Sequence, residues 1–364
     1  MSGPGMSGPG TGGAGEILAA LRALGLLAAD AAPVLEPLSG GVSSDVWRVR
    51  APGVDWCVKR ALPKLKVQKD WFAPIERNRY EADWLRVAGE IAPDNAPALI
   101  GADTGRGLLV MAFLPHEAHP LWKARLAMGD VDPSFAGAVG RVLGRIHAAT
   151  SGRDDIARRF DGDAIFHPIR LEPYLLATAE AHPDLAPALR ALVETTARTK
   201  LALVHGDVSP KNILIGPRGP VLLDAECAWH GDPAFDLAFC LNPLLLKWVL
   251  APDAAGALRR SFAALAAAYL GEVTWEPPAA LEARAAHLLP GLLLARVDGK
   301  SPVEYIQRDE DRALVRGVAR PLLARPVDQL AAIADAWRAA TAGIRPASAP
   351  APAPASAPTP TRPA

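Results

Sequence analysis

The chain has 364 residues, 50% of them hydrophobic, and its 39 basic side chains balance 39 acidic ones, so the formal net charge is zero. A neutral chain produces no long-range field that would attract nucleic acid or an anionic membrane, and we expect neither as a partner. Cys57, Cys227 and Cys240 lack the paired spacing of a disulfide framework or a zinc site, which favours reduced thiols and a cytoplasmic protein. No basic region precedes an apolar run at the start, and prolines and a lysine interrupt the longest apolar stretches, so we expect no signal peptide and no membrane span.

The two ends of the chain differ from the rest in composition. Residues 1–5 repeat directly as residues 6–10 and contain mainly Gly, Ser and Pro, whereas residues 346–364 are almost wholly Ala, Pro, Ser and Thr. Such segments have little apolar surface to bury, so we expect residues 1–15 and 346–364 to be disordered. The chain between them is long enough for two lobes, which we place at residues 16–115 and 116–345.

The first ordered elements predict a helix followed by a hairpin. Residues 16–27 place apolar side chains at helical spacing, which indicates an amphipathic helix. Residues 38–49 alternate apolar side chains around a tip that contains Gly40, Gly41 and Ser43. Small residues let backbone amides approach phosphate oxygens closely, although an ordinary hairpin turn has the same composition.

A lysine and a glutamate follow in positions where they can meet. Lys59 lies in the apolar strand 56–61, and the helix over 78–87 places Trp84 and Leu85 three and four residues after Glu81. This spacing turns Glu81 toward the buried side of its helix, where a carboxylate needs a cationic partner. We expect Lys59 to pair with Glu81, with Glu76 as the alternative. An ordinary exposed helical glutamate fits the pattern equally well, since acidic residues usually face water.

The rest of the chain is mainly helical after one further strand. The strand over 108–115 ends at Pro115 and marks the boundary between the lobes, and residues 135–149 form the next amphipathic helix. Further on, Asp207 stands five residues before Asn212 between two apolar runs, and Asp224 closes the following apolar run. Single Asp and Asn residues are mostly caps or surface groups, but this ordered set with Lys59 indicates a catalytic site.

These motifs, together with His205-Gly206-Asp207, Gly231-Asp232-Pro233 and Asp236, resemble the aminoglycoside phosphotransferase and choline kinase superfamily over residues 34–323. The resemblance implies an α+β, bilobal protein-kinase-like fold with a small N-lobe that holds an antiparallel sheet and a larger, mainly helical C-lobe. Protein kinases carry Arg at the place of Gly206 and Phe-Gly at the place of Ala225-Glu226. A small-molecule acceptor is therefore favoured over a protein.

The resemblance also implies roles for individual residues. Asp207 would accept the proton of the acceptor hydroxyl, Asn212 and Asp224 would hold Mg2+, and the donor would be ATP. Lys59, paired with Glu81, would contact the nucleotide phosphates. Further nucleotide contacts are implied for Gly40, Gly41 and Ser43 in the hairpin tip and for the backbone at Met111 and Phe113. His205 would brace the loop, Glu226 is a possible further metal ligand, and Asp236 would either hold the loop backbone or stabilise a helix N-terminus.

The acceptor is less well determined by the sequence. Residues 62–74 partly resemble methylthioribose kinases, which implies a sugar. We expect residues 295–305 and 307–320 to line or flank the acceptor cleft, where charges alternate in sign and do not form the acidic pocket that an aminoglycoside would need. Trp229, Trp248 and Trp275 either form a cage for a quaternary amine or belong to the core. A sugar-like metabolite, an aminoglycoside and an amino alcohol all remain open.

The alternative to an enzyme is a catalytically silent nucleotide-binding or scaffold protein with the same fold. The presence of Lys59, Asp207, Asn212 and Asp224 favours an ATP-dependent O-phosphotransferase that acts on a hydroxyl of a small molecule. The sequence does not indicate an oligomeric state.

Overall fold

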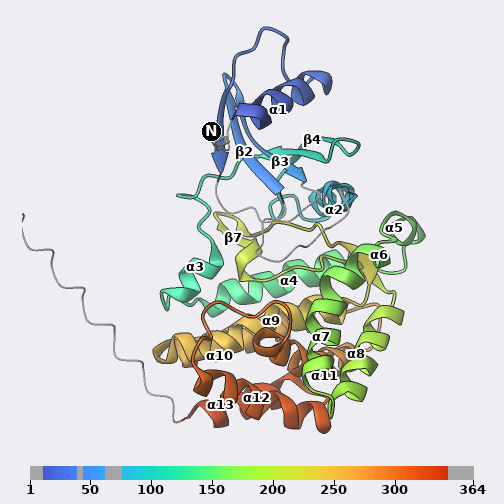
Figure 1. The fold of residues 1–364 in the computed structure, drawn as a ribbon, viewed down its shortest axis with the longest axis vertical. Helices are drawn as coiled ribbons and strands as arrows, with labels where there is room; N and C mark the ends of the chain where they lie inside the picture. Colours follow the sequence, from blue (N-terminus) through green and yellow to red (C-terminus); the bar gives the residue numbers. More distant parts are fainter. Residues whose placement is uncertain (1–10, 39–43, 62–75, 343–364) are drawn as a thin grey trace, which may run out of the picture.

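The computed structural model describes residues 11–38, 44–61 and 76–342. A small lobe built around a sheet lies on a large helical lobe (Figure 1), and the expected α+β architecture with a small antiparallel N-lobe and a larger helical C-lobe is confirmed. The hairpin tip with Gly40, Gly41 and Ser43 lies outside the described residues, as does the whole insert at 62–74. The small lobe contains α1 (Thr11–Ala23), β1 (Val34–Leu38), β2 (Ser44–Ala51), β3 (Val54–Ala61), α2 (Arg77–Ile91), β4 (Leu99–Asp103) and β5 (Leu108–Ala112).

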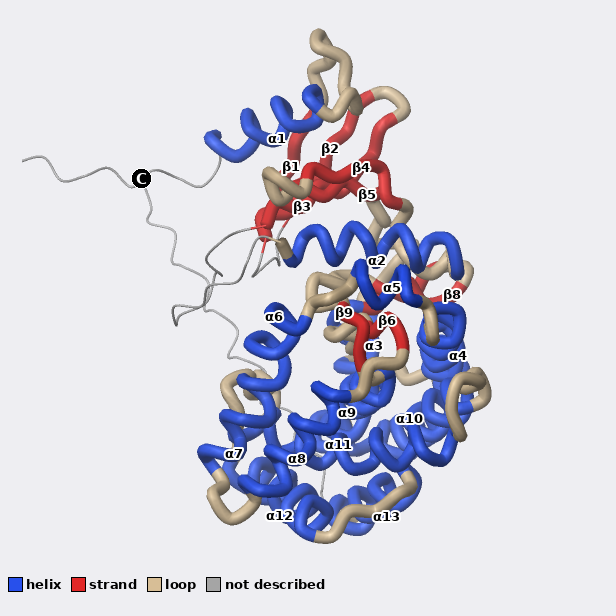
Figure 2. Tube along the Cα trace, turned by 90° about the vertical axis from the view of Figure 1, so that its right-hand side faces the viewer, coloured by secondary structure: helices blue, strands red, loops and turns tan. Residues whose placement is uncertain are grey.

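The sheet of the small lobe is antiparallel throughout, with the strand order β1-β2-β3-β5-β4. Successive side chains of a strand point to opposite faces, and β5 shows this directly. Leu108 and Val110 join a small core under α1, whereas Leu109 and Met111 join the main core of the protein. Helix α2 lies between the sheet and the large lobe (Figure 2) and contributes to that main core. Side chains on this second face therefore point toward the junction of the lobes.

Helix α1 differs from the expected helix at both ends. It begins at Thr11, within the segment expected to be disordered, because packing of Ile17 and Leu21 against the sheet outweighs the low helix propensity of the preceding glycines. It ends at Ala23, four residues before the expected end. Gly25 adopts a φ of +69°, and the amides of Gly25 and Leu26 bond back to the carbonyls of Arg22 and Leu21. This is the glycine-dependent Schellman cap.

The large lobe contains two short antiparallel strand pairs, β6 with β9 and β7 with β8. Its elements are α3 (Trp122–Ala127), α4 (Pro133–Thr150), α5 (Asp154–Arg159), α6 (Asp163–Phe166), the π-helix η1 (His167–Leu176), α7 (Ala177–Ala181), α8 (Ala186–Arg198), β6 (Ala202–Val204), the 3-10 turn η2 (Pro210–Asn212), β7 (Ile213–Gly216), β8 (Gly219–Leu222), β9 (Trp229–Gly231), α9 (Pro233–Leu250), the 3-10 turn η3 (Pro252–Ala254), α10 (Ala255–Leu270), α11 (Pro278–Asp298), α12 (Asp309–Ala324) and α13 (Leu330–Thr341).

Helix α9 runs through the centre of this lobe. Within the described part of the chain it is the one helix that is long and apolar enough to cross a membrane. It meets both criteria although it contains Pro243 and Lys247. However, 89% of its apolar window is buried inside the protein, as in the core helix of a folded lobe. We expected Pro243 and Lys247 to make this stretch too short and too polar for a membrane span, and its length and composition show that this was wrong. Its apolar side chains pack inside the large lobe.

Helices α4 and α10 pack closely because α4 carries glycines at the contact. A Cβ atom added to Gly140 would lie 2.3 Å from the carbonyl oxygen of Leu265, which is backbone and cannot move aside without shifting α10. At Gly137, one turn earlier, the nearest atom would be the carbonyl oxygen of Ala264 at 3.6 Å, an ordinary contact. A methyl group added at Gly140 would therefore destabilise the contact between α4 and α10, whereas one added at Gly137 would not.

We predict that Gly140→Ala lowers the free energy of unfolding by about 1–3 kcal/mol because of overpacking. Gly137→Ala is the matched control and should raise it by about 0.5–1 kcal/mol through helix propensity. Urea denaturation followed by circular dichroism measures both. Equal effects of the two variants would contradict the close contact between α4 and α10.

Candidate active site

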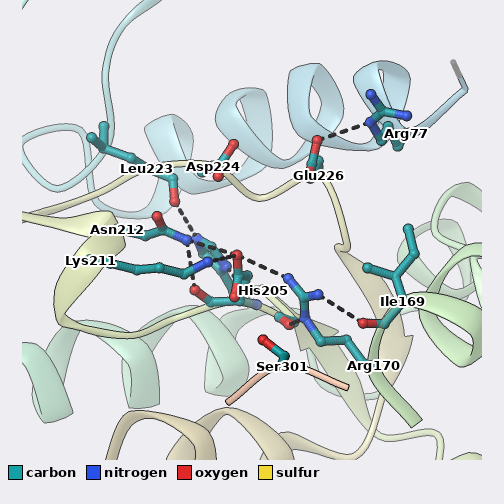
Figure 3. A network of polar contacts seen from close by, with 12 residues as sticks. Arg77, Ile169, Arg170, His205, Lys211, Asn212, Leu223, Asp224, Glu226 and Ser301 are labelled. Carbon is teal, nitrogen blue, oxygen red and sulfur yellow. Dashed lines mark hydrogen bonds and ion pairs between the residues drawn. The ribbon is translucent and has the colours of Figure 1, made fainter. Parts of the chain in front are cut away.

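The predicted catalytic loop follows β6 and leads into η2, and the segment with Asp224 follows β8. The two segments are joined where the amide of Leu223 donates to the carbonyl of Asn212 over 2.9 Å. Figure 3 shows Asn212, Lys211, His205 and Asp224 gathered beneath α2. The structure thus brings the candidate base and both candidate metal ligands into one region at the junction of the lobes.

Asp207 has one oxygen that is fully engaged and one that is not. Its Oδ2 accepts from Lys211 Nζ and Asn212 Nδ2, each at 2.9 Å, and lies 2.9 Å from the guanidinium of Arg170. Its Oδ1 is buried and has no hydrogen-bond partner among the described residues. Buried polar atoms are nearly always paired in folded proteins. The unpaired Oδ1 is the atom that a bound hydroxyl would satisfy.

Lys59 contacts two carboxylates, one from each lobe. Its Nζ donates to both oxygens of Glu81 at 2.7 Å and to Oδ1 of Asp224 at 2.6 Å. The expected ion pair with Glu81, rather than with Glu76, is therefore present. Lys59 and Glu81 are both buried, with 8% and 2% of their surface exposed. Such a cluster needs mutual compensation of charge, since each ion has lost most of its hydration.

The charges in this cluster shift the pKa values of its members. Burial lowers the pKa of Lys59, but Asp224 and Glu81 outweigh it and raise the pKa above its ordinary value, so the ammonium stays charged. Burial raises the pKa of Asp224, and Lys59 more than reverses this, so the carboxyl is ionised at neutral pH. Burial raises the pKa of Glu81 to about 7 against the opposing effect of Lys59. Asp224 is therefore the stronger anion.

The backbone of Asp224 is unusual. Its φ of +67° makes it the one non-glycine residue with positive φ in the described ranges. This left-handed conformation is uncommon outside glycine and costs roughly 1 kcal/mol or more, and such residues cluster at functional sites. The surrounding structure holds it through the bond from Leu223 and the ion pair with Lys59.

His205 and Asp236 support the loop rather than face the cleft. His205 Nδ1 accepts from the amide of Asp207 at 3.2 Å, and its Nε2 donates to the carbonyl of Leu223 at 3.1 Å, which links the two functional segments. Burial lowers the pKa of His205, in keeping with this neutral form. Asp236 accepts from the amides of His205 and Gly206 at 2.7 and 2.9 Å. Asp236 therefore holds the loop backbone, while Asp232 caps α9 by accepting from Ala234.

Gly206 occupies its position for a steric reason. Its φ is +77°, and a Cβ atom would lie 2.5 Å from the carbonyl oxygen of Cys227. No other residue fits there without moving the backbone. The glycine that separates this chain from protein kinases is thus required by the approach of the two segments.

Arg170 is a candidate functional residue that the sequence analysis missed. It lies in the π-helix η1 and is buried, and its guanidinium donates to the carbonyl of Gly206 at 2.5 Å besides contacting Asp207. Figure 3 shows Arg170 directed toward the loop. No spacing rule identifies it, because π-helices are rare and are not marked by a period of 3.6 residues. The prolines at 168 and 173 were the available sign of an irregular helix.

Glu226 and the hinge make contacts that the sequence did not predict. Glu226 Oε2 pairs with Arg77 of α2 at 3.0 Å (Figure 3). Met111 lies inside the sheet between β3 and β4, and the amide of Phe113 donates to the carbonyl of Asp55 at 3.1 Å. The amide of Leu114 follows without a backbone partner in the described chain.

A cavity of about 120 Å³ opens beside the catalytic loop. The loop contributes Ser209 and Lys211 to its lining, and residues of the expected segment 295–305 contribute as well. The second expected segment, 307–320, does not line it, because most of it forms α12 on the outer side of α11. Trp229 and Trp248 belong to the hydrophobic core, so they form no cage for a quaternary amine.

The sequence model of the phosphotransferase enzyme family matches residues 34–281 of this chain, which include Lys59, Glu81, Arg170, the catalytic loop and the segment with Asp224. The chain belongs to the phosphotransferase enzyme family. Methylthioribose kinase of Erwinia tasmaniensis is 27% identical over 222 residues, which cover 54% of this chain and 55% of that protein. Methylthioribose kinase of Yersinia enterocolitica is 25% identical over 226 residues, with coverages of 55% and 56%. The chain thus spans about half the length of the curated relatives that it matches.

Among solved structures, an amicoumacin kinase in complex with AMP-PNP, Ca2+ and Ami is similar, with a TM-score of 0.53 and 14% sequence identity. The match covers 81% of this chain and 90% of that one. At this identity the likeness concerns the fold, and the kinase-like fold implied by the sequence motifs is confirmed. Membership of the phosphotransferase enzyme family and the bilobal fold therefore agree.

We predict that Lys59→Met lowers the free energy of unfolding by about 3–5 kcal/mol, because it leaves Glu81 and Asp224 without their shared cation. Adding Glu81→Gln to that variant should restore part of the loss, since one buried charge is removed. Arg106→Met, which breaks the exposed pair with Asp103, is the control and should cost about 1 kcal/mol or less. Urea denaturation is the measurement, and a Lys59→Met loss no larger than the control would contradict the buried cluster.

Proposed function

We propose that this protein is an ATP-dependent O-phosphotransferase that transfers the γ-phosphoryl group to a hydroxyl of a small molecule. The observation that carries the proposal is the convergence of Lys59, Asp207, Asn212 and Asp224 in one hydrogen-bonded region between the lobes. A catalytically silent protein has no need for the buried charges and the strained backbone at Asp224. The relatives named as methylthioribose kinases support the same class of reaction.

The donor set fits Mg2+. Asn212 turns its Nδ2 toward Asp207, to which it donates twice, so its carbonyl oxygen is left for another partner. Asp224 is ionised and uses Oδ1 for Lys59. Mg2+ prefers hard oxygen ligands and commonly takes one or two from the protein, with phosphate and water oxygens completing its shell. We assign Asn212 and Asp224 as these two ligands, and the ion would neutralise charge on the transferred group.

The remaining groups align the reactants. Phosphoryl transfer passes through a loose transition state, so positioning and cations matter more than a strong nucleophile. Asp207 orients the acceptor hydroxyl through Oδ1 and accepts its proton late, while Arg170 and Lys211 hold Oδ2 in place. Lys59, held by Glu81, contacts the nucleotide phosphates, to which Gly40, Gly41 and Ser43 would add donors. The adenine would bind at the hinge around Met111 and Phe113, with the Leu114 amide as the donor.

The two lobes divide this work. Residues 16–115 form the nucleotide-binding part and residues 116–345 form the catalytic and acceptor-binding part. Cys57, Cys227 and Cys240 are free thiols, which supports a reducing compartment such as the cytoplasm.

We predict that Asp207→Asn lowers kcat by about 10²–10⁴-fold with little change in the KM for ATP, because the base is lost while the nucleotide contacts remain. Asp130→Asn, at an exposed ion pair, is the control. ATP consumption with Mg2+ is measured against aminoglycosides, choline, methylthioribose and other sugars. The proposal fails if no acceptor is phosphorylated and slow ATP hydrolysis is the same in wild type and Asp207→Asn.

We predict that Asp224→Asn raises the Mg2+ concentration needed for half-maximal ATP consumption by at least about tenfold, since one anionic ligand becomes neutral. A Mg2+ titration at fixed ATP measures this, with Asp130→Asn as the unaffected reference. An unchanged Mg2+ dependence in Asp224→Asn would remove Asp224 from the metal site.

A further inference from the structure

The cavity beside the catalytic loop carries an excess of positive charge. Lys211 belongs to the loop wall, Lys247 to α9 and Arg296 to α11, and Lys123 of α3 completes the cationic set. Glu304 is the one acidic side chain among the described residues that line the cavity, and it pairs with Lys123 at 2.5 Å. Lys211 is paired with Asp207 of the loop. Lys247 and Arg296 are therefore the two cations of this lining that have no carboxylate partner among the described residues.

Lys247 is the most unusual of these groups. Only 2% of its surface is exposed, and its Nζ has no hydrogen-bond partner in the part of the chain that the structure describes. The ammonium lies 4.8 Å from the centre of the Tyr305 ring, which offers a weak cation–π contact in place of an anion. Burial, together with Lys123, lowers the pKa of Lys247 to about 8. A buried ammonium without a partner is costly, so the site is incomplete without a ligand that accepts from it.

Asn242, in the same helix, is a second buried polar side chain without a hydrogen-bond partner among the described residues, and it is neutral. It is 3% exposed, and both Nδ2 and Oδ1 lack partners among the described residues. Its amide lines the same cavity as Lys247. Two adjacent groups that are buried, polar and unsatisfied indicate a built binding site, because isolated cases are rare in native structures.

Arg296 is held in place at this cavity. Its Nη1 donates to the Tyr174 hydroxyl at 3.1 Å, to the Ser301 carbonyl at 2.6 Å and to the Ser301 hydroxyl at 2.9 Å. In the view of Figure 3, Ser301 lies below the catalytic loop, whereas Asp224 lies above it. The guanidinium is thereby preorganised to add positive charge on the acceptor side of Asp207.

We propose that this cavity binds an acidic group of the phosphate acceptor, so that the acceptor is a hydroxylated small molecule carrying a carboxylate or a phosphate. Lys247 supplies the ammonium, Asn242 an amide donor and Arg296 further positive charge. The inference rests on the proposed function, since it assigns the substrate class of the same site. The assignment argues against polycationic aminoglycosides and quaternary amines as acceptors, because this positively charged lining repels them.

The test compares acceptors that differ in one acidic group. Gluconate is paired with sorbitol and glycerate with glycerol for the carboxylate arm, and glucose 6-phosphate with glucose for the phosphate arm; kanamycin and choline are the cationic probes. Binding is measured by titration calorimetry with AMP-PNP and Mg2+ present, and turnover by ATP consumption. In at least one arm the acid should exceed its neutral partner by at least about tenfold in affinity or kcat/KM, because it accepts charged hydrogen bonds that the neutral partner cannot form.

Variants locate the preference in the cavity. Lys247→Met should abolish the preference for the acid, Lys247→Arg should retain it, and Asn242→Leu should weaken it. Lys200→Met removes a lysine paired with Asp163 outside the cavity and should change neither acid nor alcohol. Retention of the preference in Lys247→Met, or its loss in Lys200→Met, would overturn the assignment.

The pH dependence gives an independent readout. Lys247 loses its proton as the pH rises through about 8, so binding of the acid should weaken between about pH 7 and 9 while binding of the neutral partner stays constant. The other charged and titratable groups that line the cavity are Lys123, Glu304, Tyr305, Tyr174, Arg296 and Lys211. An acid preference that is equal at pH 7 and 9 contradicts the role of Lys247.

The two proposals fail in different ways. If wild type and Asp207→Asn consume ATP equally with every acceptor, the phosphotransferase proposal fails. Asp207-dependent transfer to sorbitol, glucose, kanamycin or choline, with no acid preferred in either arm, leaves the phosphotransferase standing and overturns the acidic subsite. The same holds if no acid binds better than its neutral partner.

Discussion

The arrangement of the two lobes depends on the ion pairs of the buried Lys59 ammonium. Lys59 comes from the sheet of the small lobe, and it contacts Glu81 of α2 and Asp224 of the large lobe. Three charges withdrawn from water are stable only together, so the positions of the sheet, α2 and the segment after β8 are coupled. The same contact holds Asp224 in its left-handed conformation. The nucleotide side of the site and the junction of the lobes are thus one electrostatic unit.

A second carboxylate, Asp236, has the corresponding role on the catalytic side. It accepts from two successive amides of the loop, while Gly206 permits the backbone to pass within reach of Cys227. Arg170 then bridges the loop carbonyl and Asp207. Protein kinases use an arginine within the loop itself, next to the catalytic Asp, and here the cation approaches from η1 instead. The loop geometry is consequently set by the buried contacts of Asp236, Gly206 and Arg170.

The sequence was sufficient for features that depend on local spacing. The helical spacing of Glu81, Trp84 and Leu85 correctly placed the carboxylate inward. The motifs that resemble the phosphotransferase superfamily correctly implied the bilobal fold. Features that depend on long-range packing were not predictable. Arg170 lies in a π-helix, which has no recognisable period in the sequence. The contact of Lys59 with Asp224 requires a left-handed backbone at Asp224, which no residue pattern predicts. The start of α1 was misplaced because tertiary contacts outweighed its glycines.

Helix α9 connects the catalytic loop with the acceptor cavity. Asp236 in its first turns holds the loop, and Asn242 and Lys247 further along face the cavity. The helix is buried on nearly every side, so these groups keep a constant spacing. ATP and an acidic acceptor repel each other, and they can meet only if each charge is compensated where it binds. In our proposal Asn212 and Asp224 would hold the metal that compensates the charge of ATP, and Lys247 and Arg296 would compensate the charge of the acceptor. A single rigid helix that carries both the loop anchor and the cation would set the distance between the acidic group and the reacting hydroxyl, which makes the length of the acceptor as decisive as its charge.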